Sequence, residues 1–190
     1  MTTSTAMATK SPNVKRNAQP ILVTLFESIS VNGIIARPDD DAGFFTNINW
    51  TAFIDVAKEA GAMVWGRRTH EMYGGQAIAD LQGVRGFVLT SNRKFRVEVG
   101  WRVATTPKEA VKLAAEAGSK GLAVVGGSSV NAAFAQAGLI DKVVLNVESV
   151  LIGEGIPLFA PTKFDIHLEL REIKKLTSTV IQIRYDVHLP

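Results

Sequence analysis

Apolar residues recur along the chain in short runs that are separated by more polar segments. The first run is ILVTLF at residues 21–26, and the later runs are AMVWG, RGFVLTS, WRVAT, LAVVGG and KVVLNVE. Short apolar runs of this kind are typical of strands buried on both faces of a sheet. Between the first two runs, WTAFIDVAKEAG has apolar residues three or four positions apart, which predicts a helix. We expect Asn47 or Asn49 to cap its start and Gly61 to end it.

Three more helices are expected, each following a predicted strand. The segment RRTHEMYGG begins one, and SSVNAAFAQAG forms another directly after a pair of glycines. The helix KEAVKLAAEAG has the strongest local signal, because Thr106 and Glu109 have the spacing of a capping box and Pro107 stands at the first helical position.

The last part of the chain changes to a period of two. Apolar and polar residues alternate over residues 164–171 and again over residues 181–189, which predicts an antiparallel hairpin turning near Leu176–Ser178. Strands separated by helices, followed by such a hairpin, indicate an α/β fold. Its central sheet is mostly parallel, with helices on both faces and a C-terminal antiparallel hairpin.

The composition of the chain restricts the number of domains and the class of protein. A chain of 190 residues with 46% hydrophobic and 21% charged residues predicts one globular domain, over residues 21–190. Residues 1–20 are rich in Thr, Ser and Ala without apolar periodicity, so we expect a disordered tail, with a transit peptide as the alternative. The chain has no cysteine, which excludes disulfides and cysteine chemistry. It also has no apolar run long enough to span a bilayer and no secretory signal, so a cytoplasmic protein is expected.

The formal net charge of +3 comes from the first 20 residues, through Lys10, Lys15 and Arg16. The remaining 170 residues hold 18 basic and 18 acidic side chains. A neutral body argues against binding of nucleic acid, which requires a concentrated basic face. The histidines are His70, His167 and His188, and their spacing gives no metal site. We therefore expect a small-molecule substrate.

Two predicted strand-to-helix junctions suit the binding of phosphate. One contains Gly126, Gly127, Ser128 and Ser129, where the backbone can approach a ligand closely. The other is Gly66–Thr69, which adds two guanidinium groups. Together they suggest one diphosphate, although a glycine pair after a strand is equally well explained as a tight turn.

A third basic segment follows the strand FVLTS. It contains Asn92, Arg93, Lys94 and Arg96, and it could hold the extra phosphate that distinguishes NADPH from NADH. A solvated basic loop is the alternative. The dinucleotide fingerprint GxGxxG and the Walker A loop are both absent.

Four segments, VWGRRT, VLTSN, VVGGSSV and VLIGEGIPLF, occur in an order that resembles the dihydrofolate-reductase-like family. The resemblance covers about residues 20 to 189 and is strongest to the reductase domain of riboflavin-biosynthesis deaminase-reductases and their stand-alone relatives. It implies a three-layer fold, NADPH as cofactor, a homodimer, and hydride transfer from NADPH to a pyrimidine-linked ribose phosphate or a related heterocycle.

The resemblance also implies the positions of the cofactor. Gly66, Arg67, Arg68 and Thr69 would lie beside its phosphates, Thr90, Ser91 and Arg93 beside the adenosine ribose phosphate, and Gly126, Gly127, Ser128, Ser129 and Val130 beside the diphosphate. The loop Ser28–Ala36 would close over the nicotinamide. Trp65 is expected in the core, and Tyr73 is a candidate for the pocket lining.

The chain departs from the family at the positions expected to act in catalysis. The family commonly has Ser-x-Asp-Gly after its first strand, whereas this chain reads Ser30, Val31, Asn32, Gly33, and an asparagine cannot supply a proton as a carboxylic acid does. Ser149 stands where a proline is usual. Asn32, Ser30 and Glu148 are the catalytic candidates.

Three other functions stay open from the sequence. The first is an NADP(H)-binding protein without catalysis. The second is a reductase of another heterocycle or carbonyl compound. The third is a dihydrofolate reductase, for which the helical carboxylates Asp55 and Glu59 are the residues to consider, although solvated side chains are the better explanation of both.

Overall fold

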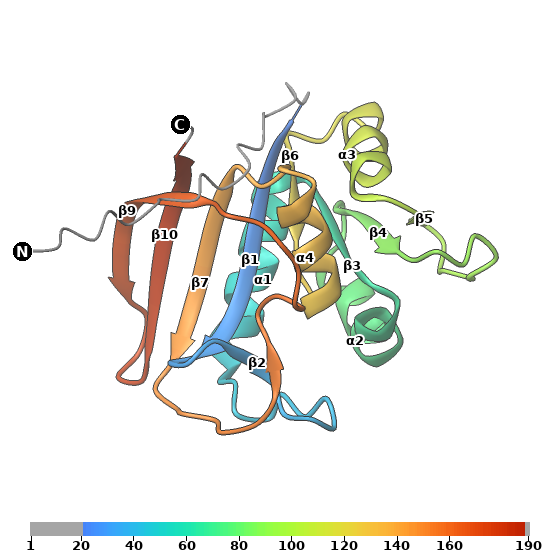
Figure 1. Ribbon diagram of the computed structural model, residues 1–190. Helices are drawn as coiled ribbons and strands as arrows, with labels where there is room; N and C mark the ends of the chain where they lie inside the picture. The colour runs from blue at the N-terminus through green and yellow to red at the C-terminus, as the bar shows by residue number, and fades with distance from the viewer. Residues whose placement is uncertain (1–20, 189–190) are drawn as a thin grey trace, which may run out of the picture.

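The computed structural model describes residues 21–188, so the predicted tail at residues 1–20 lies outside the described residues. Four helices and ten strands form this part of the chain (Figure 1). In chain order they are β1 Leu22–Ser30, β2 Ile34–Ala36, α1 Asn47–Ala60, β3 Ala62–Gly66, α2 Arg67–Asp80, β4 Arg85–Leu89, β5 Trp101–Ala104, α3 Pro107–Glu116, β6 Gly121–Val124, α4 Ser128–Gln136, β7 Lys142–Glu148, β8 Ile156–Pro157, β9 His167–Lys175 and β10 Val180–His188.

Eight of the strands form one sheet in the order β5-β4-β3-β6-β1-β7-β10-β9. The pairs from β5 to β7 are all parallel, whereas β10 runs antiparallel to both β7 and β9. This arrangement confirms the predicted α/β fold, with a mostly parallel sheet and a C-terminal antiparallel hairpin.

Helices cover both faces of the parallel part of the sheet, which gives three layers (Figure 1). On one face, α3 and α4 pack through residues such as Val111 and Phe134 against β1, β3 and β6. On the other face, α1 and α2 pack through residues such as Phe53 and Ala77, with Trp65 of β3 in the same cluster. The expected core position of Trp65 is confirmed.

The predicted local signals for α1 and α3 are mostly confirmed. Gly61 ends α1 with a φ of 79°, a left-handed conformation that glycine adopts without strain. The hydroxyl of Thr106 accepts a hydrogen bond from the Glu109 N–H at 3.1 Å, as a capping box requires. The Glu109 carboxylate, however, accepts from the Thr105 N–H at 2.7 Å rather than from Thr106.

Several boundaries differ from the prediction. The first arm of the hairpin, expected over residues 164–171, is β9 at His167–Lys175. Strand β1 continues past Phe26 to Ser30, because β7 pairs with it along its whole second half, up to Ser30 opposite Glu148. The segment Ser28–Ala36 is therefore not one loop: it contains the end of β1, a tight turn and β2, which pairs with β8. Helix α1 begins at Asn47, so its N-cap residue is Thr46 and neither of the two predicted asparagines.

No helix among residues 21–188 is long and apolar enough to cross a membrane.

Candidate active site

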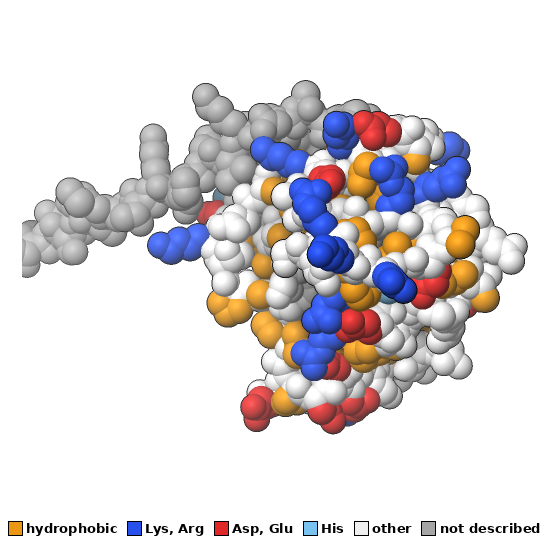
Figure 2. Space-filling model, turned by 90° about the vertical axis from the view of Figure 1, so that its right-hand side faces the viewer, with side chains coloured by type: hydrophobic (Ala, Val, Ile, Leu, Met, Phe, Trp, Pro, Cys, Tyr) orange, Lys and Arg blue, Asp and Glu red, His pale blue; other side chains and the backbone are white. Residues whose placement is uncertain are grey.

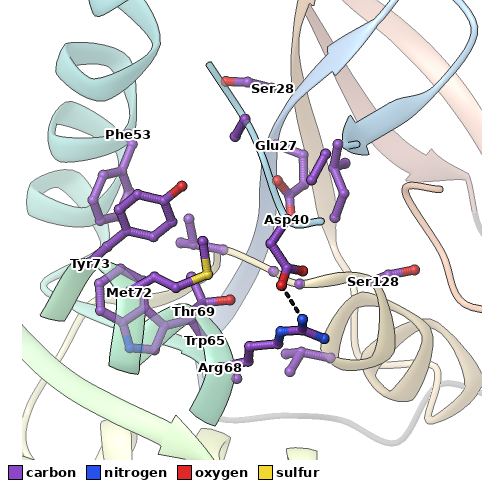
Figure 3. Close-up of a pocket in the computed structure, with 18 of the residues that line it drawn as sticks. Glu27, Ser28, Asp40, Phe53, Trp65, Arg68, Thr69, Met72, Tyr73 and Ser128 are labelled. Carbon is purple, nitrogen blue, oxygen red and sulfur yellow. Dashed lines mark ion pairs between the residues drawn. The ribbon is translucent and has the colours of Figure 1, made fainter. Parts of the chain in front are cut away.

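A cavity of about 680 Å³ lies at the carboxyl ends of the central parallel strands β1, β3 and β6. Ligands of open α/β sheets bind outside this edge, where helix N-termini face outward. The lining comes from the second half of β1, the end of β3, the segment between β2 and α1, the starts of α1 and α4, and one face of α2. Two residues of β2 and one each of β4 and β8 complete it. Figure 3 shows this cavity with α1 and α2 on one side and α4 on the other.

The turn before α4 brings Gly126, Gly127, Ser128, Ser129 and Val130 into the lining, as predicted. Gly126 has a φ of 69°, which favours glycine. The Ser128 side chain is only 8% exposed, and its hydroxyl has no hydrogen-bond partner among the described residues. The first N–H groups of a helix also have no intrahelical partner. This turn therefore presents several donors to the cavity.

The turn between β3 and α2 lies directly beside it. The Gly66 N–H donates to the Gly126 carbonyl at 2.8 Å, and a Cβ on Gly66 would meet Val130 at 3.1 Å. All four predicted residues of this turn, Gly66, Arg67, Arg68 and Thr69, line the cavity. The structure thus brings two helix N-termini to one cavity.

Both arginines of this turn already have carboxylate partners. Arg67 pairs with Glu71 at 2.9 Å, one helical turn further along α2. Arg68 pairs with Asp40 from the segment between β2 and α1, as the dashed line in Figure 3 marks. The Asp40–Arg68 ion pair connects that segment to α2 across the cavity.

The wall formed by α1, α2 and the end of β3 is aromatic. Phe53 and Trp65 stack with ring centroids 6.1 Å apart and an interplanar angle of 29°, and Trp50 packs on Phe53 at 5.2 Å. Tyr73 lies beside them, so its predicted place in the lining is confirmed (Figure 3). Burial, together with the charges of Asp40 and Asp41, raises the pKa of the Tyr73 hydroxyl. This wall suits a flat ring.

The predicted ribose-phosphate residues Thr90, Ser91 and Arg93 follow β4, whose last residue, Leu89, does line the cavity. None of the three is itself in the lining. The Arg93 side chain is 75% exposed and donates to the Thr105 hydroxyl at 3.2 Å. Figure 2 shows the side of the molecule that carries α2 and the β4–β5 loop, where Lys and Arg side chains are spread among acidic and apolar ones.

Two of the catalytic candidates, Ser30 and Asn32, lie outside the lining and form bonds within the chain. The Ser30 hydroxyl donates to the Asn32 side-chain oxygen at 2.9 Å and accepts from the Ile34 N–H. The Asn32 amide donates to the Ile152 carbonyl at 2.7 Å and accepts from the Ile152 N–H at 3.1 Å. A carboxylate could not donate to that carbonyl, which gives a structural reason for asparagine at this position.

The third candidate, Glu148, is buried in a polar network under α1. Its carboxylate accepts from the Thr46 N–H and hydroxyl, both at 2.7 Å, and from the Asn49 amide at 2.6 Å. The Asn49 oxygen in turn accepts from Ser28 and from Asn146. Glu148 thus fixes the start of α1, and catalytic roles for it, Ser30 and Asn32 stay predictions.

Sequence reasoning missed two cavity carboxyls, Glu27 and Asp40. Glu27 could have been found as an acidic residue within the apolar stretch LVTLFESIS, but the predicted strand stopped one residue before it. Asp40 belongs to a run of three aspartates that reads as a surface turn. Asp55 and Glu59 are exposed on α1 and do not line the cavity.

Comparisons with known proteins agree with this architecture. A pyrimidine reductase-like protein of Corynebacterium diphtheriae superposes with a TM-score of 0.68 at 17% identity, covering 90% of this chain and 93% of that one. A deaminase/5-amino-6-(5-phosphoribosylamino)uracil reductase of Thermotoga maritima gives a TM-score of 0.70 at 13% identity, over 88% of this chain and 57% of the other. The riboflavin biosynthesis reductase Rib7 of Saccharomyces cerevisiae gives a TM-score of 0.62 at 14% identity, over 92% of this chain and 93% of the other.

In sequence, the chain is 36% identical over 66 residues to YyaP of Bacillus subtilis, a protein described as uncharacterized. That match spans 35% of this chain and 35% of the length of YyaP. The family model described as the RibD C-terminal domain matches residues 22–182, nearly the whole described chain, and supports an oxidoreductase. The resemblance inferred from the sequence motifs is therefore confirmed: this chain belongs to the RibD C-terminal domain family.

Proposed function

We propose that this protein is an NADPH-dependent reductase. The observation that carries the proposal is the convergence of two helix N-termini on one cavity, where the Gly66 N–H bonds to the Gly126 carbonyl at 2.8 Å. Helix N-termini attract phosphate through their free N–H groups and their partial positive charge. Two such ends side by side suit a diphosphate.

The residues present fit a pyridine dinucleotide. Gly126 to Val130 and Gly66 to Thr69 would hold its phosphates, and the buried Ser128 hydroxyl, which lacks a partner among the described residues, would donate to one of them. Arg93 and Lys94 would bind the extra phosphate of NADPH. When bound, the nicotinamide supplies a hydride. The chain itself binds the dinucleotide, orients both reactants and excludes water from the cavity.

For the substrate we propose the pyrimidine-linked ribose phosphate of riboflavin synthesis, on the strength of the family membership. A specific observation favours a second candidate. Both arginines of the cavity lining are already ion-paired, to Glu71 and Asp40, and one wall of the cavity is aromatic. A flat heterocycle or carbonyl compound without a phosphate would suit this wall as well.

Titration with NADPH and NADH, followed by tryptophan fluorescence, tests cofactor binding, because Trp50 and Trp65 both line the cavity. We expect saturable quenching with a preference for NADPH. Turnover is then tested by the loss of NADPH absorbance with 5-amino-6-(5-phosphoribosylamino)uracil and with a set of unphosphorylated heterocycles and carbonyl compounds. Binding without turnover of any of them would favour a dinucleotide-binding protein without catalysis. Absence of binding would refute the proposal.

We also propose a homodimer that pairs through the C-terminal hairpin. Strand β9 is the edge of the sheet, and every one of its residues is exposed in the single chain. Among them are large apolar side chains, with Leu168, Leu170 and Ile173 between 42% and 60% exposed. An exposed edge strand offers unpaired backbone groups to a second chain, and these three apolar side chains would be covered by the pairing.

A further inference from the structure

The Glu27 carboxyl lies inside the cavity, on the central strand β1 (Figure 3). One of its oxygens accepts a hydrogen bond from the Asn131 amide of α4 at 2.8 Å. Asn131 is fully buried and also donates to the Leu158 carbonyl, so its amide is held in place. A Cβ on Gly126 would come within 2.3 Å of the same Glu27 oxygen. The carboxyl therefore packs directly against the glycine turn.

Glu27 differs from the other ionisable side chains that line the cavity. Asp40 and Arg68 are paired with each other, and Arg67 is paired with Glu71. The remaining ionisable group, the Tyr73 hydroxyl, has a raised pKa and stays protonated at neutral pH. Among the described residues of the lining, Glu27 is thus the one carboxyl without a cationic partner.

Burial is the largest influence on the ionisation of Glu27. It raises the pKa of the carboxyl from 4.5 to about 7, although hydrogen bonds from Asn131 and from the Ser28 backbone act in the opposite direction. A large part of the protein therefore carries a protonated Glu27 at neutral pH. Proton donors in catalysis work best when their pKa lies near the working pH.

We propose that Glu27 is the acid of this site, donating a proton to the substrate atom next to the carbon that receives the hydride. This inference rests on the proposed reductase function. The family's loop aspartate is replaced by Asn32, whose amide is bonded to Ile152, so the proton must come from elsewhere. Glu27 is in contact with the cavity and Asn32 is not.

The reaction then balances as follows. The C=O or C=N bond of the substrate gains a hydride at carbon, and its π electron pair moves to oxygen or nitrogen. That atom forms a bond to the Glu27 proton, while the O–H bond of the carboxyl breaks and leaves a carboxylate. The hydride comes from the reduced nicotinamide, which is oxidised by two electrons. Water reprotonates Glu27 before the next cycle.

The first test measures binding rather than activity. Bound NADPH would displace water from Glu27 and bring negative phosphates near it, and both effects favour the protonated carboxyl. The affinity for NADPH, followed by tryptophan fluorescence from pH 6 to 9, should therefore fall above pH ~7 in the wild type, by up to about tenfold per unit for one linked proton. Calorimetry in two buffers of different ionisation enthalpy should show proton uptake.

Glu27→Gln keeps the size of the side chain but cannot titrate. We expect this variant to bind NADPH with the same affinity from pH 6 to 9 and without proton uptake. Asp55→Asn, which removes an exposed carboxylate of α1, is the matched control and should behave as the wild type. Circular dichroism establishes that each variant is folded. If Glu27→Gln does not fold, Glu27→Asp, which retains an acid, replaces it in the test. The NADPH affinity of Glu27→Asp should still depend on pH, with a midpoint shifted from that of the wild type.

With any substrate that the wild type reduces, Glu27→Gln should lower the rate by about 10²-fold or more, the usual effect of losing a general acid. The decrease of the reduction rate above pH 7, which we expect in the wild type, should be absent in this variant. The same pH dependence of NADPH affinity in wild type and Glu27→Gln would overturn the role of Glu27, and so would an unchanged rate. A wild type that does not bind NADPH at any pH would instead refute the reductase function, and the role of Glu27 with it.

Discussion

Replacing Glu27 by glutamine should stabilise the protein at high pH and leave its stability little changed at low pH. The pKa of Glu27 is about 7 in the folded protein, against an ordinary 4.5, so the folded state binds the proton more tightly than the unfolded state. The free energy of unfolding therefore decreases as the pH rises from about 4.5 through 7. A difference of 2.5 units corresponds to about 3 kcal/mol, an upper bound because the side chain keeps some contact with solvent in the cavity.

Glutamine does not titrate, and it can still accept the hydrogen bond from Asn131. The measurement is urea unfolding at pH 5, 6, 7 and 8, followed by circular dichroism, for the wild type, Glu27→Gln and the control Asp55→Asn. We expect the advantage of Glu27→Gln over the wild type to grow by about 1–3 kcal/mol between pH 5 and 8. An advantage that stays constant or shrinks across this range would refute the argument that burial controls the ionisation of Glu27.

Three further predictions concern other parts of the molecule. Glu148→Gln should lower stability by about 1–3 kcal/mol in urea unfolding, because the buried Asn49 amide and the Thr46 donors lose their charged acceptor. An unchanged free energy of unfolding in this variant would contradict the prediction. The double substitution Arg93→Ala and Lys94→Ala should abolish the preference for NADPH over NADH in a fluorescence titration, and a preserved preference would show that the basic loop is only solvated. Ile173→Lys, on the exposed edge strand β9, should turn a dimer into a monomer in light scattering; a wild type that is already monomeric would refute the proposed pairing.

Much of the fold could be predicted because its signals are local. Strand β3 and strand β6 are short apolar runs, and α3 begins at a capping residue with a proline directly after it. Each signal depends on residues within a few positions of one another. Gly66 ends one apolar strand and Gly126 follows another, so the two turns that line the cavity could also be located from the sequence.

The strand boundaries near the site required long-range contacts. Strand β1 reaches Ser30 because β7, more than 110 residues later, continues to pair with it. The short strands β2 and β8 have two or three residues each and exist through their pairing with one another. Segments this short are too short to show the alternation of apolar and polar residues that identifies a strand in the sequence. The sequence therefore indicated a loop where the structure has ordered strands.

The sequence by itself determined the order along the chain of the four helices and of the eight strands of the large sheet, the hairpin, and the two glycine turns that line the cavity. Only the tertiary structure decided which polar side chains face the cavity. Asn32 is bonded to a residue 120 positions away, and Glu27 to one 104 positions away, so neither environment could be predicted from neighbours in the chain. The pKa of a carboxyl depends on burial and on its bonding partners, and both are properties of the folded chain. For this reason the bonds that Ser30, Asn32 and Glu148 form within the chain, and the place of the overlooked Glu27 in the cavity, became visible only in the folded structure.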